Sequence, residues 1–351
     1  MLRWSTSHRL PFDMRTTDPH RPIIDSTVIN NDIWSVLTYA DSHEQKLKYE
    51  IAVFNTKSLE TTKIDCEIPD FGMYGVRSIA SQADQMYLLT FNKKAFTIYK
   101  CDTRTMMFTE FFTIHENLRG KLQIIGDHMY TLGIDNDMQL LLFEINLVDK
   151  DVQVAVLIPR IETDEYKLHT INDTLYLFHL GFQLTVFRID ENWNAQELQL
   201  TSSHERFPEF YQSVGESVIT ELPLFAKDRL RLETMDFENK KWNRTNIEDI
   251  KDYSTCCGFD SAKQLGDRIY VTLQTASLRY EIRVLELKPT LADICLQQLV
   301  DDVLIQKEGS KLESVLEVLK IPMRQKLTNM IEWRKEHLQW ITKLGRPQIT
   351  L

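Results

Sequence analysis

The most constraining feature of this 351-residue chain is a six-fold internal repeat across residues 26–288. Each repeat contains an apolar run, a polar corner, an aromatic-centred segment, a loop, a second apolar segment and a final short segment. The corners are Asn31-Asp32-Ile33-Trp34, Asp84-Gln85-Met86-Tyr87, Asp127-His128-Met129-Tyr130, Asp173-Thr174-Leu175-Tyr176, Glu216-Ser217-Val218-Ile219 and Asp267-Arg268-Ile269-Tyr270. Their last positions are 53, 43, 46, 43 and 51 residues apart. This period, filled with short β-rich segments, predicts a mainly β fold: a six-bladed β-propeller with one four-stranded blade per repeat.

The second half of each repeat keeps the same register. Its apolar segment ends at Asn55, Asp102, Asn146, Asp190 and Asp236, with Lys288 at the equivalent place in the sixth repeat. The aromatic residues Phe108 and Trp242 follow two of these positions by six residues. With the Asp-x-x-Tyr corners, this arrangement resembles a kelch repeat. The glycine pair of kelch repeats is missing, and the chain has only 11 Gly. The sequence therefore supports the propeller fold more strongly than membership of the kelch family.

Composition limits the class of protein. With 43% hydrophobic and 26% charged residues, the chain can bury a large core and still present a polar surface. No window approaches 18 uninterrupted apolar residues, and residues 1–25 lack the apolar stretch of a secretory signal. The five cysteines, at 66, 101, 256, 257 and 295, do not suggest a disulfide framework. We therefore expect no membrane association and a reducing compartment, the cytoplasm or the nucleus.

Charge is unevenly distributed along the chain. Residues 289–351 hold nine Lys and Arg and eight Asp and Glu, so residues 1–288 hold 32 basic and 43 acidic residues and carry a charge of about −11. An acidic domain disfavours direct nucleic-acid binding, which depends on neutralising phosphates. It favours a basic protein partner by electrostatic complementarity, and a zinc-finger or RNA-binding protein fits this description. The alternative is that the charge only keeps the surface soluble.

The sequence lacks the common catalytic motifs, including metalloprotease, hydrolase, Walker and dinucleotide-binding signatures. The recurring corner carboxylates are expected to cap turns through side-chain to backbone hydrogen bonds. His169 and His179 have no partner set at metal-ligand spacing and are expected to be ordinary strand residues. The adjacent Cys256 and Cys257 are an equally weak metal or redox site. We expect no catalytic residues, no cofactor and no metal.

The segment after the repeats has helical periodicity. Leu291, Cys295 and Leu299 are spaced i, i+4, i+8 and would form one stripe along a helix. Pro322 marks a break between two further amphipathic runs, made by Leu312, Val315, Leu316 and Leu319, and then by Leu327, Met330, Ile331, Leu338 and Ile341. Three short helices have little interior of their own and need a partner or the upstream domain to cover them. The predicted organisation is an N-terminal tail over 1–25, the propeller over 26–288 and a helical module over 289–351.

This C-terminal segment resembles a SOCS box. The resemblance rests on Thr290-Leu291-Ala292-Asp293-Ile294-Cys295-Leu296-Gln297-Gln298-Leu299, followed by Leu319-Lys320-Ile321-Pro322. It implies a non-catalytic substrate receptor of an Elongin and cullin ubiquitin ligase. By residue, it assigns Leu291, Cys295 and Leu299 to Elongin C, which is bound to Elongin B, and Ile321, Pro322 and Leu327 to the cullin. Many boxes of the cullin-5 type have proline at the position of Lys320, so cullin-2 is the favoured partner and cullin-5 the alternative.

Three alternatives remain open from the sequence. The helices of the last segment could cap the chain's own propeller, which would make the protein a free-standing interaction scaffold. Residues 294–299 could instead form the outermost strand of the final blade. A propeller enzyme such as a glycan hydrolase would need acid and base groups that converge on the channel mouth, and no motif supports one.

Overall fold

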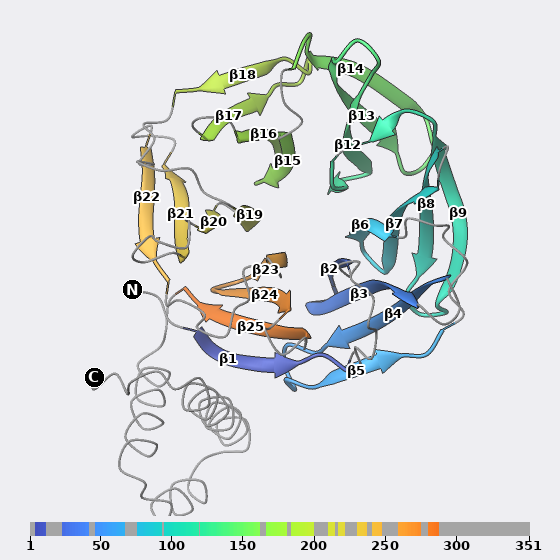
Figure 1. Cartoon of the computed structure of the whole chain (residues 1–351), viewed down its shortest axis with the longest axis vertical. Coiled ribbons are helices and arrows are strands. Elements are labelled where there is room, and N and C mark those ends of the chain that lie inside the picture. Colours follow the sequence, from blue (N-terminus) through green and yellow to red (C-terminus); the bar gives the residue numbers. More distant parts are fainter. Residues whose placement is uncertain are drawn as a thin grey trace, which may run out of the picture.

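A computed structural model describes the fold for residues 4–11, 23–41, 46–66, 76–92, 95–118, 120–161, 166–180, 184–199, 210–214, 217–221, 230–236, 241–247, 259–274 and 280–287. Within these ranges the regular elements are 25 β-strands, which form six antiparallel sheets. The sheets are arranged as blades in a ring around a common axis (Figure 1). The predicted six-bladed propeller is therefore confirmed, whereas the predicted helical module over 289–351 lies outside the described residues. The described part contains no helix that could cross a membrane.

The first three blades follow the repeats of the sequence. The first blade consists of β2 (Ile23–Ile29), β3 (Asp32–Asp41), β4 (Lys46–Phe54) and β5 (Thr61–Ile64). The second consists of β6 (Val76–Gln82), β7 (Gln85–Asn92), β8 (Ala95–Asp102) and β9 (Met107–Ile114). The third consists of β10 (Asn117–Leu118), β11 (Gln123–Ile125), β12 (His128–Ile134), β13 (Leu140–Asn146) and β14 (Val152–Ile158). In this third blade, β10 and β11 both pair with β12, so the innermost strand is divided into two short pieces.

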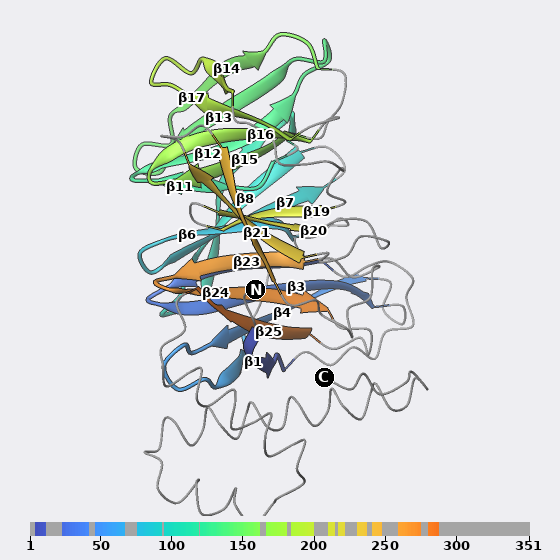
Figure 2. The same ribbon diagram turned by 90° about the vertical axis from the view of Figure 1, so that its left-hand side faces the viewer.

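The last three blades complete the ring. The fourth consists of β15 (Tyr166–Ile171), β16 (Thr174–Leu180), β17 (Leu184–Ile189) and β18 (Ala195–Leu198). The fifth consists of β19 (Phe210–Val214), β20 (Ser217–Glu221), β21 (Leu230–Asp236) and β22 (Lys241–Asn246). The sixth consists of β23 (Phe259–Leu265), β24 (Arg268–Gln274), β25 (Tyr280–Glu286) and β1 (Trp4–Arg9). Figure 2 shows the ring edge-on.

The N-terminus supplies the outermost strand of the sixth blade. β1 pairs with β25 in antiparallel register, with Arg9 opposite Glu281 and Thr6 opposite Val284. This corrects the prediction that residues 1–25 form a tail outside the propeller, because β1 lies within the ring and β2 already begins at Ile23. β1 also occupies the position considered above for 294–299, residues that lie outside the described part of the chain. Without β1, the outer edge of β25 would present unpaired backbone N–H and C=O groups, and pairing with β1 supplies their hydrogen-bond partners.

The hydrophobic core is divided among the boundaries between blades. Separate clusters of buried side chains lie between each pair of neighbours around the ring. Between the sixth and first blades, Leu10 is fully buried with Phe54 of β4 and Tyr280 of β25. The Leu10 backbone N–H also donates to the Tyr280 carbonyl at 2.8 Å. The residue after β1 therefore seals the boundary that closes the ring.

Turn chemistry explains where the third strand of a blade ends. Asn55 Oδ1 accepts from the N–H groups of Lys57 and Ser58, at 3.0 and 2.8 Å. Asp102, Asn146 and Asp190 accept two backbone N–H groups each in the same way. A short side chain with an acceptor oxygen stabilises a turn by this bond, which is why Asp and Asn recur at these positions.

Two of the corner aspartates, Asp84 and Asp127, have a different role from the one predicted for them. Asp84 accepts from Asn30 Nδ2 of the first blade at 2.7 Å, and hydrogen bonds from Asn30 and Arg104 lower the pKa of this carboxyl. Asp127 accepts from Gln82 Nε2 of the second blade at 2.8 Å. The turn-capping prediction is thus wrong for these two side chains, because their turns bring the carboxylates against the preceding blade. Their role is nevertheless structural.

We expect Leu10→Ala to destabilise the protein by about 2–5 kcal/mol, because it removes a fully buried side chain from the boundary that closes the ring. The matched control is Arg9→Ala, which changes the exposed neighbouring residue and should alter stability by less than about 0.5 kcal/mol. Urea unfolding followed by tryptophan fluorescence measures both. Equal effects of the two substitutions would contradict this role for Leu10.

The stability of the closed ring should also depend on pH, through His8 of β1. The His8 side chain is buried, its ring lies 4.9 Å from that of Phe54, and burial lowers its pKa to about 4. An unfolded histidine has a pKa near 6.5, so the unfolded chain takes up the proton more readily than the folded one. The contribution of neutral His8 to stability is complete above pH 6.5 and is lost as the pH falls toward 4.

This loss amounts to about 3 kcal/mol over that pH range. His8→Leu removes the group that takes up the proton. As the pH falls from 6.5 to 4, the free energy of unfolding of this variant should therefore rise by that amount relative to that of the unmodified protein. Chemical unfolding at several pH values measures the difference. Parallel pH profiles for the two proteins would show that His8 does not contribute.

Candidate functional site in the central channel

The six residues assigned to partner binding from the sequence all lie outside the described part of the chain. They are Leu291, Cys295 and Leu299 for Elongin C, and Ile321, Pro322 and Leu327 for the cullin. Within the described residues, charged and polar side chains from several blades meet in the central channel, which the sequence analysis did not anticipate.

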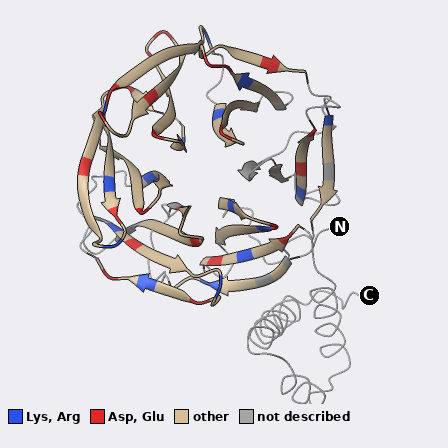
Figure 3. Ribbon diagram, turned by 180° about the vertical axis from the view of Figure 1, so that it is seen from behind, with Lys and Arg blue, Asp and Glu red and all other residues tan. Residues whose placement is uncertain are grey.

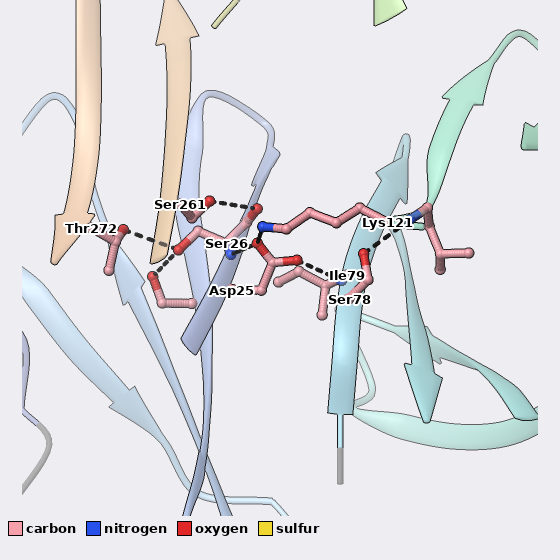
Figure 4. Close-up of polar contacts among 9 residues, drawn as sticks. Asp25, Ser26, Ser78, Ile79, Lys121, Ser261 and Thr272 are labelled. Atoms are coloured by element: carbon pink, nitrogen blue, oxygen red, sulfur yellow. Dashed lines mark hydrogen bonds and ion pairs between the residues drawn. The ribbon is translucent and has the colours of Figure 1, made fainter. Parts of the chain in front are cut away.

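Asp25, on the innermost strand of the first blade, is the centre of this arrangement (Figure 4). Its Oδ2 accepts the N–H of Ile79 in the second blade at 3.0 Å. Its Oδ1 accepts the N–H of Ser26 at 3.0 Å and lies 3.1 Å from Lys121 Nζ of the third blade. A buried carboxylate is stable only with such partners. One side chain thereby links three successive blades.

Hydroxyl groups continue this network to both sides of Asp25. Ser26 Oγ lies 3.0 Å from Thr272 Oγ1 of the sixth blade, and Ser261 Oγ donates to the Ser26 carbonyl at 3.4 Å. On the other side, Ser78 Oγ of the second blade accepts the Leu122 N–H of the third at 3.0 Å. The channel wall is therefore held together by polar contacts as well as by the apolar clusters behind it.

Lys121 reaches Asp25 because the innermost strand of the third blade is interrupted. Residues 120–122 lie between β10 and β11 and belong to neither strand. A Cβ at Gly120 would lie 2.9 Å from the backbone nitrogen of Leu132 in β12, closer than real Cβ contacts allow. Glycine therefore permits the close approach that precedes Lys121.

The channel contains a cavity of about 720 Å³. Its described lining comes from the first, second, third, fourth and sixth blades and includes four basic side chains against a single carboxylate. The basic residues are Arg77 of β6, Lys121, Lys167 of β15 and Lys263 of β23, and the carboxylate is Asp25. Counting His169 as neutral, these side chains give the cavity a net charge of about +3, opposite in sign to the chain as a whole.

The electrostatics of the wall reflect this concentration of positive charge. Burial lowers the pKa of His169 well below its usual range, and the charges of Lys167, Lys121 and Lys263 act in the same direction. Burial also lowers the pKa of Lys263, while the Asp25 carboxylate opposes this effect and Lys121 adds to it. The lysines are thus close enough to influence the same neighbours, although they come from different blades.

Part of the wall is apolar. Leu89, Phe91 and Phe96 of the second blade and Leu118 of the third line the cavity, and the rings of Phe91 and Phe96 stack with their centroids 4.4 Å apart. Such a surface excludes water and lowers the local dielectric constant, which strengthens the field of the nearby cations.

The two histidines noted in the sequence lie on the fourth blade. Both are strand residues, as predicted: His169 is buried on β15 and lines the cavity, and His179 of β16 stacks on Tyr166 at 4.3 Å between ring centroids. Among the described residues, no group of three or more His, Cys, Asp or Glu side chains could hold a metal ion. Cys256 and Cys257 lie outside the described residues.

We expect Asp25→Ala to destabilise the protein by about 2–3 kcal/mol, because it leaves two backbone N–H groups and one ammonium without their acceptor. Asp25→Asn keeps an oxygen that can accept one N–H and should lose less. Asp137→Ala, at an exposed carboxylate, serves as the control and should change little. Chemical unfolding of the three variants tests this order, which equal losses for the first two would contradict.

No protein-family model matches the sequence, and no curated protein is similar to it in sequence. Solved structures do resemble the fold. A protein of unknown function from Bacteroides thetaiotaomicron matches over 81% of this chain and 74% of its own, at 8% identity and a TM-score of 0.51. TolB from Acinetobacter baumannii matches over 76% and 80%, at 12% identity and a TM-score of 0.44.

An acylaminoacyl peptidase from Pyrococcus horikoshii matches over 72% of this chain, at 13% identity and a TM-score of 0.45. This chain spans only 43% of the peptidase, so it corresponds to less than half of that protein. At these sequence identities the similarities show a shared fold, and they assign no activity, substrate or partner to this chain.

Proposed function

We propose that this protein is a non-catalytic substrate receptor of an Elongin and cullin ubiquitin ligase. In this proposal, the propeller binds the substrate protein and the segment after it binds Elongin C and a cullin. A recruited conjugating enzyme then transfers ubiquitin to the substrate, which leads to its proteasomal degradation. The observation that carries the proposal is the sequence pattern from Thr290 to Leu299, followed by Ile321-Pro322.

The way in which the ring closes supports this division of roles. β1 pairs along the outer edge of β25, and Leu10 fills the boundary with the first blade. The sixth blade therefore has its four strands without any residue after 287. Because ring closure does not require the residues after 287, that segment would be free to bind a partner protein.

The residue assignments follow the SOCS-box resemblance. Leu291 would be the anchor in the Elongin C groove, and the small Cys295 would let the helix approach closely, with Leu299 extending the stripe. Ile321, Pro322 and Leu327 would contact the cullin. Lys320 stands where boxes of the cullin-5 type often have proline, which favours cullin-2.

The propeller supplies a rigid scaffold for substrate loops, as is usual for this fold. The negative charge of residues 1–288 favours a basic client on the outer surfaces, such as a zinc-finger or RNA-binding protein. Figure 3 shows Asp and Glu around the whole ring, interspersed with Lys and Arg. The positive channel cavity would not attract a basic client, so such a client would bind to the outer faces and loops.

An enzymatic role has less support from the geometry. A glycan hydrolase needs two carboxylates that face each other across the substrate. Among the described residues that line the cavity, Asp25 is the single carboxylate, and Lys121 and two backbone N–H groups already bind it. This arrangement favours a binding role.

The test is co-purification of the full chain with Elongin B and Elongin C. We expect the unmodified protein to bind and the double variant Leu291→Ala, Cys295→Ala to bind at least about thirty-fold more weakly, because loss of an interface anchor costs about 2 kcal/mol or more.

The matched control is the double variant Ile321→Ala, Pro322→Ala, which should retain Elongin and lose cullin-2. Thermal unfolding verifies that both variants keep the propeller. No association of the unmodified protein with Elongin would refute the receptor function and leave an interaction scaffold.

A further inference from the structure

The channel cavity has the opposite charge to the protein that surrounds it. The chain carries a net charge of −10, yet the described residues that line this cavity include four basic side chains and a single carboxylate. Concave sites with one sign of charge and low-dielectric walls concentrate ions of the opposite sign. The cavity is therefore suited to an anion, whereas the protein as a whole is suited to cations.

We propose that the central channel binds a small polyanion that bears phosphate groups, held by Arg77, Lys121, Lys167 and Lys263. This site is separate from the proposed Elongin and cullin contacts and does not depend on them. The guanidinium of Arg77 can donate two parallel hydrogen bonds to one phosphate, and the lysine ammonium groups act as point charges on others.

The four cations come from four different blades, which suits a compact ligand with several charged groups. Arg77 belongs to the second blade, Lys121 to the third, Lys167 to the fourth and Lys263 to the sixth. The ligand would be held from several sides by side chains on or next to the innermost strands. Because these strands are parts of paired sheets, the backbone positions from which the cations extend are fixed before the ligand arrives.

Positive charges brought together in this way repel one another, and Asp25 offsets only part of the repulsion. Asp25 lies 3.1 Å from Lys121 Nζ, and its other oxygen accepts a backbone N–H. Burial is the main cause of the lowered pKa of Lys263; the Asp25 carboxylate opposes this shift, and Lys121 adds to it by a smaller amount. A bound polyanion would offset this repulsion, so its binding would stabilise the folded protein.

The dimensions favour a small molecule over an acidic peptide. A cavity of about 720 Å³ lies within the range of small-ligand sites, about 300–1,000 Å³. The apolar wall formed by Leu89, Phe91, Phe96 and Leu118 can contact a non-polar part of the same molecule. An extended acidic peptide would instead need a groove open along several residues.

The experiment is isothermal titration calorimetry of the full chain at constant ionic strength with three probes: sodium tripolyphosphate, citrate and an octapeptide of glutamate. We expect tripolyphosphate to bind with one-to-one stoichiometry and more tightly than the other two. No binding of tripolyphosphate would overturn the proposal. Tighter binding of citrate would overturn the phosphate preference, and tighter binding of the peptide would overturn the small-molecule class.

Two variants locate the site. Lys263→Met should bind tripolyphosphate at least about tenfold more weakly. It should have an unchanged or higher Tm without the probe, because it removes an ammonium group whose burial is unfavourable. Lys57→Met, in an exposed turn of the first blade, should bind as the unmodified protein does. Equal binding by Lys263→Met and the unmodified protein would overturn the proposal. Lys167→Met, at an exposed position of the lining, repeats the test if Lys263→Met does not fold.

Discussion

The pairing of β1 with β25 is the contact on which the rest of this structure depends. Each cluster of buried apolar side chains lies between two neighbouring blades, so a single blade has no complete core of its own. The apolar surfaces at the two ends of the blade array are buried only when the ring closes. β1 supplies the missing strand, and Leu10 fills the last boundary, so a short N-terminal segment secures a core distributed over all six blades.

Ring closure also creates the channel and decides which side chains meet in it. Asp25, Ser78, Lys121 and Lys167 each lie nine residues before the last position of their repeat corner. Equivalent positions on or beside the innermost strands converge on the axis of a propeller, so polar residues at this register are brought together from separate blades. The carboxylate of Asp25 partly offsets the positive charge, because it accepts a hydrogen bond from the second blade and forms an ion pair with Lys121 of the third.

The sequence predicted the parts of the fold that repeat. The period and the corner residues predicted six blades, and the Asp and Asn positions predicted the ends of third strands such as β4 and β8, because each feature is local and recurs. The role of Trp4–Arg9 was not predictable in this way, since the strand occurs once and pairs with residues about 280 positions away. The positive cavity was missed because net charge averages over the surface, whereas the channel field depends on the inward register of a few residues. The shared register of Asp25, Lys121 and Lys167 was the available signal.

The two proposed binding functions are linked by electrostatics. A basic client that covers the channel mouth would meet repulsion from Arg77 and the three lysines of the cavity, although the outer surfaces attract it. A polyanion in the channel would neutralise this repulsion and leave the outer attraction unchanged. Thermodynamic reciprocity then requires that the client also strengthen binding of the polyanion. Because the cations lie on or beside the innermost strands that ring closure holds in place, this coupling needs no conformational change in the propeller and acts through charge alone.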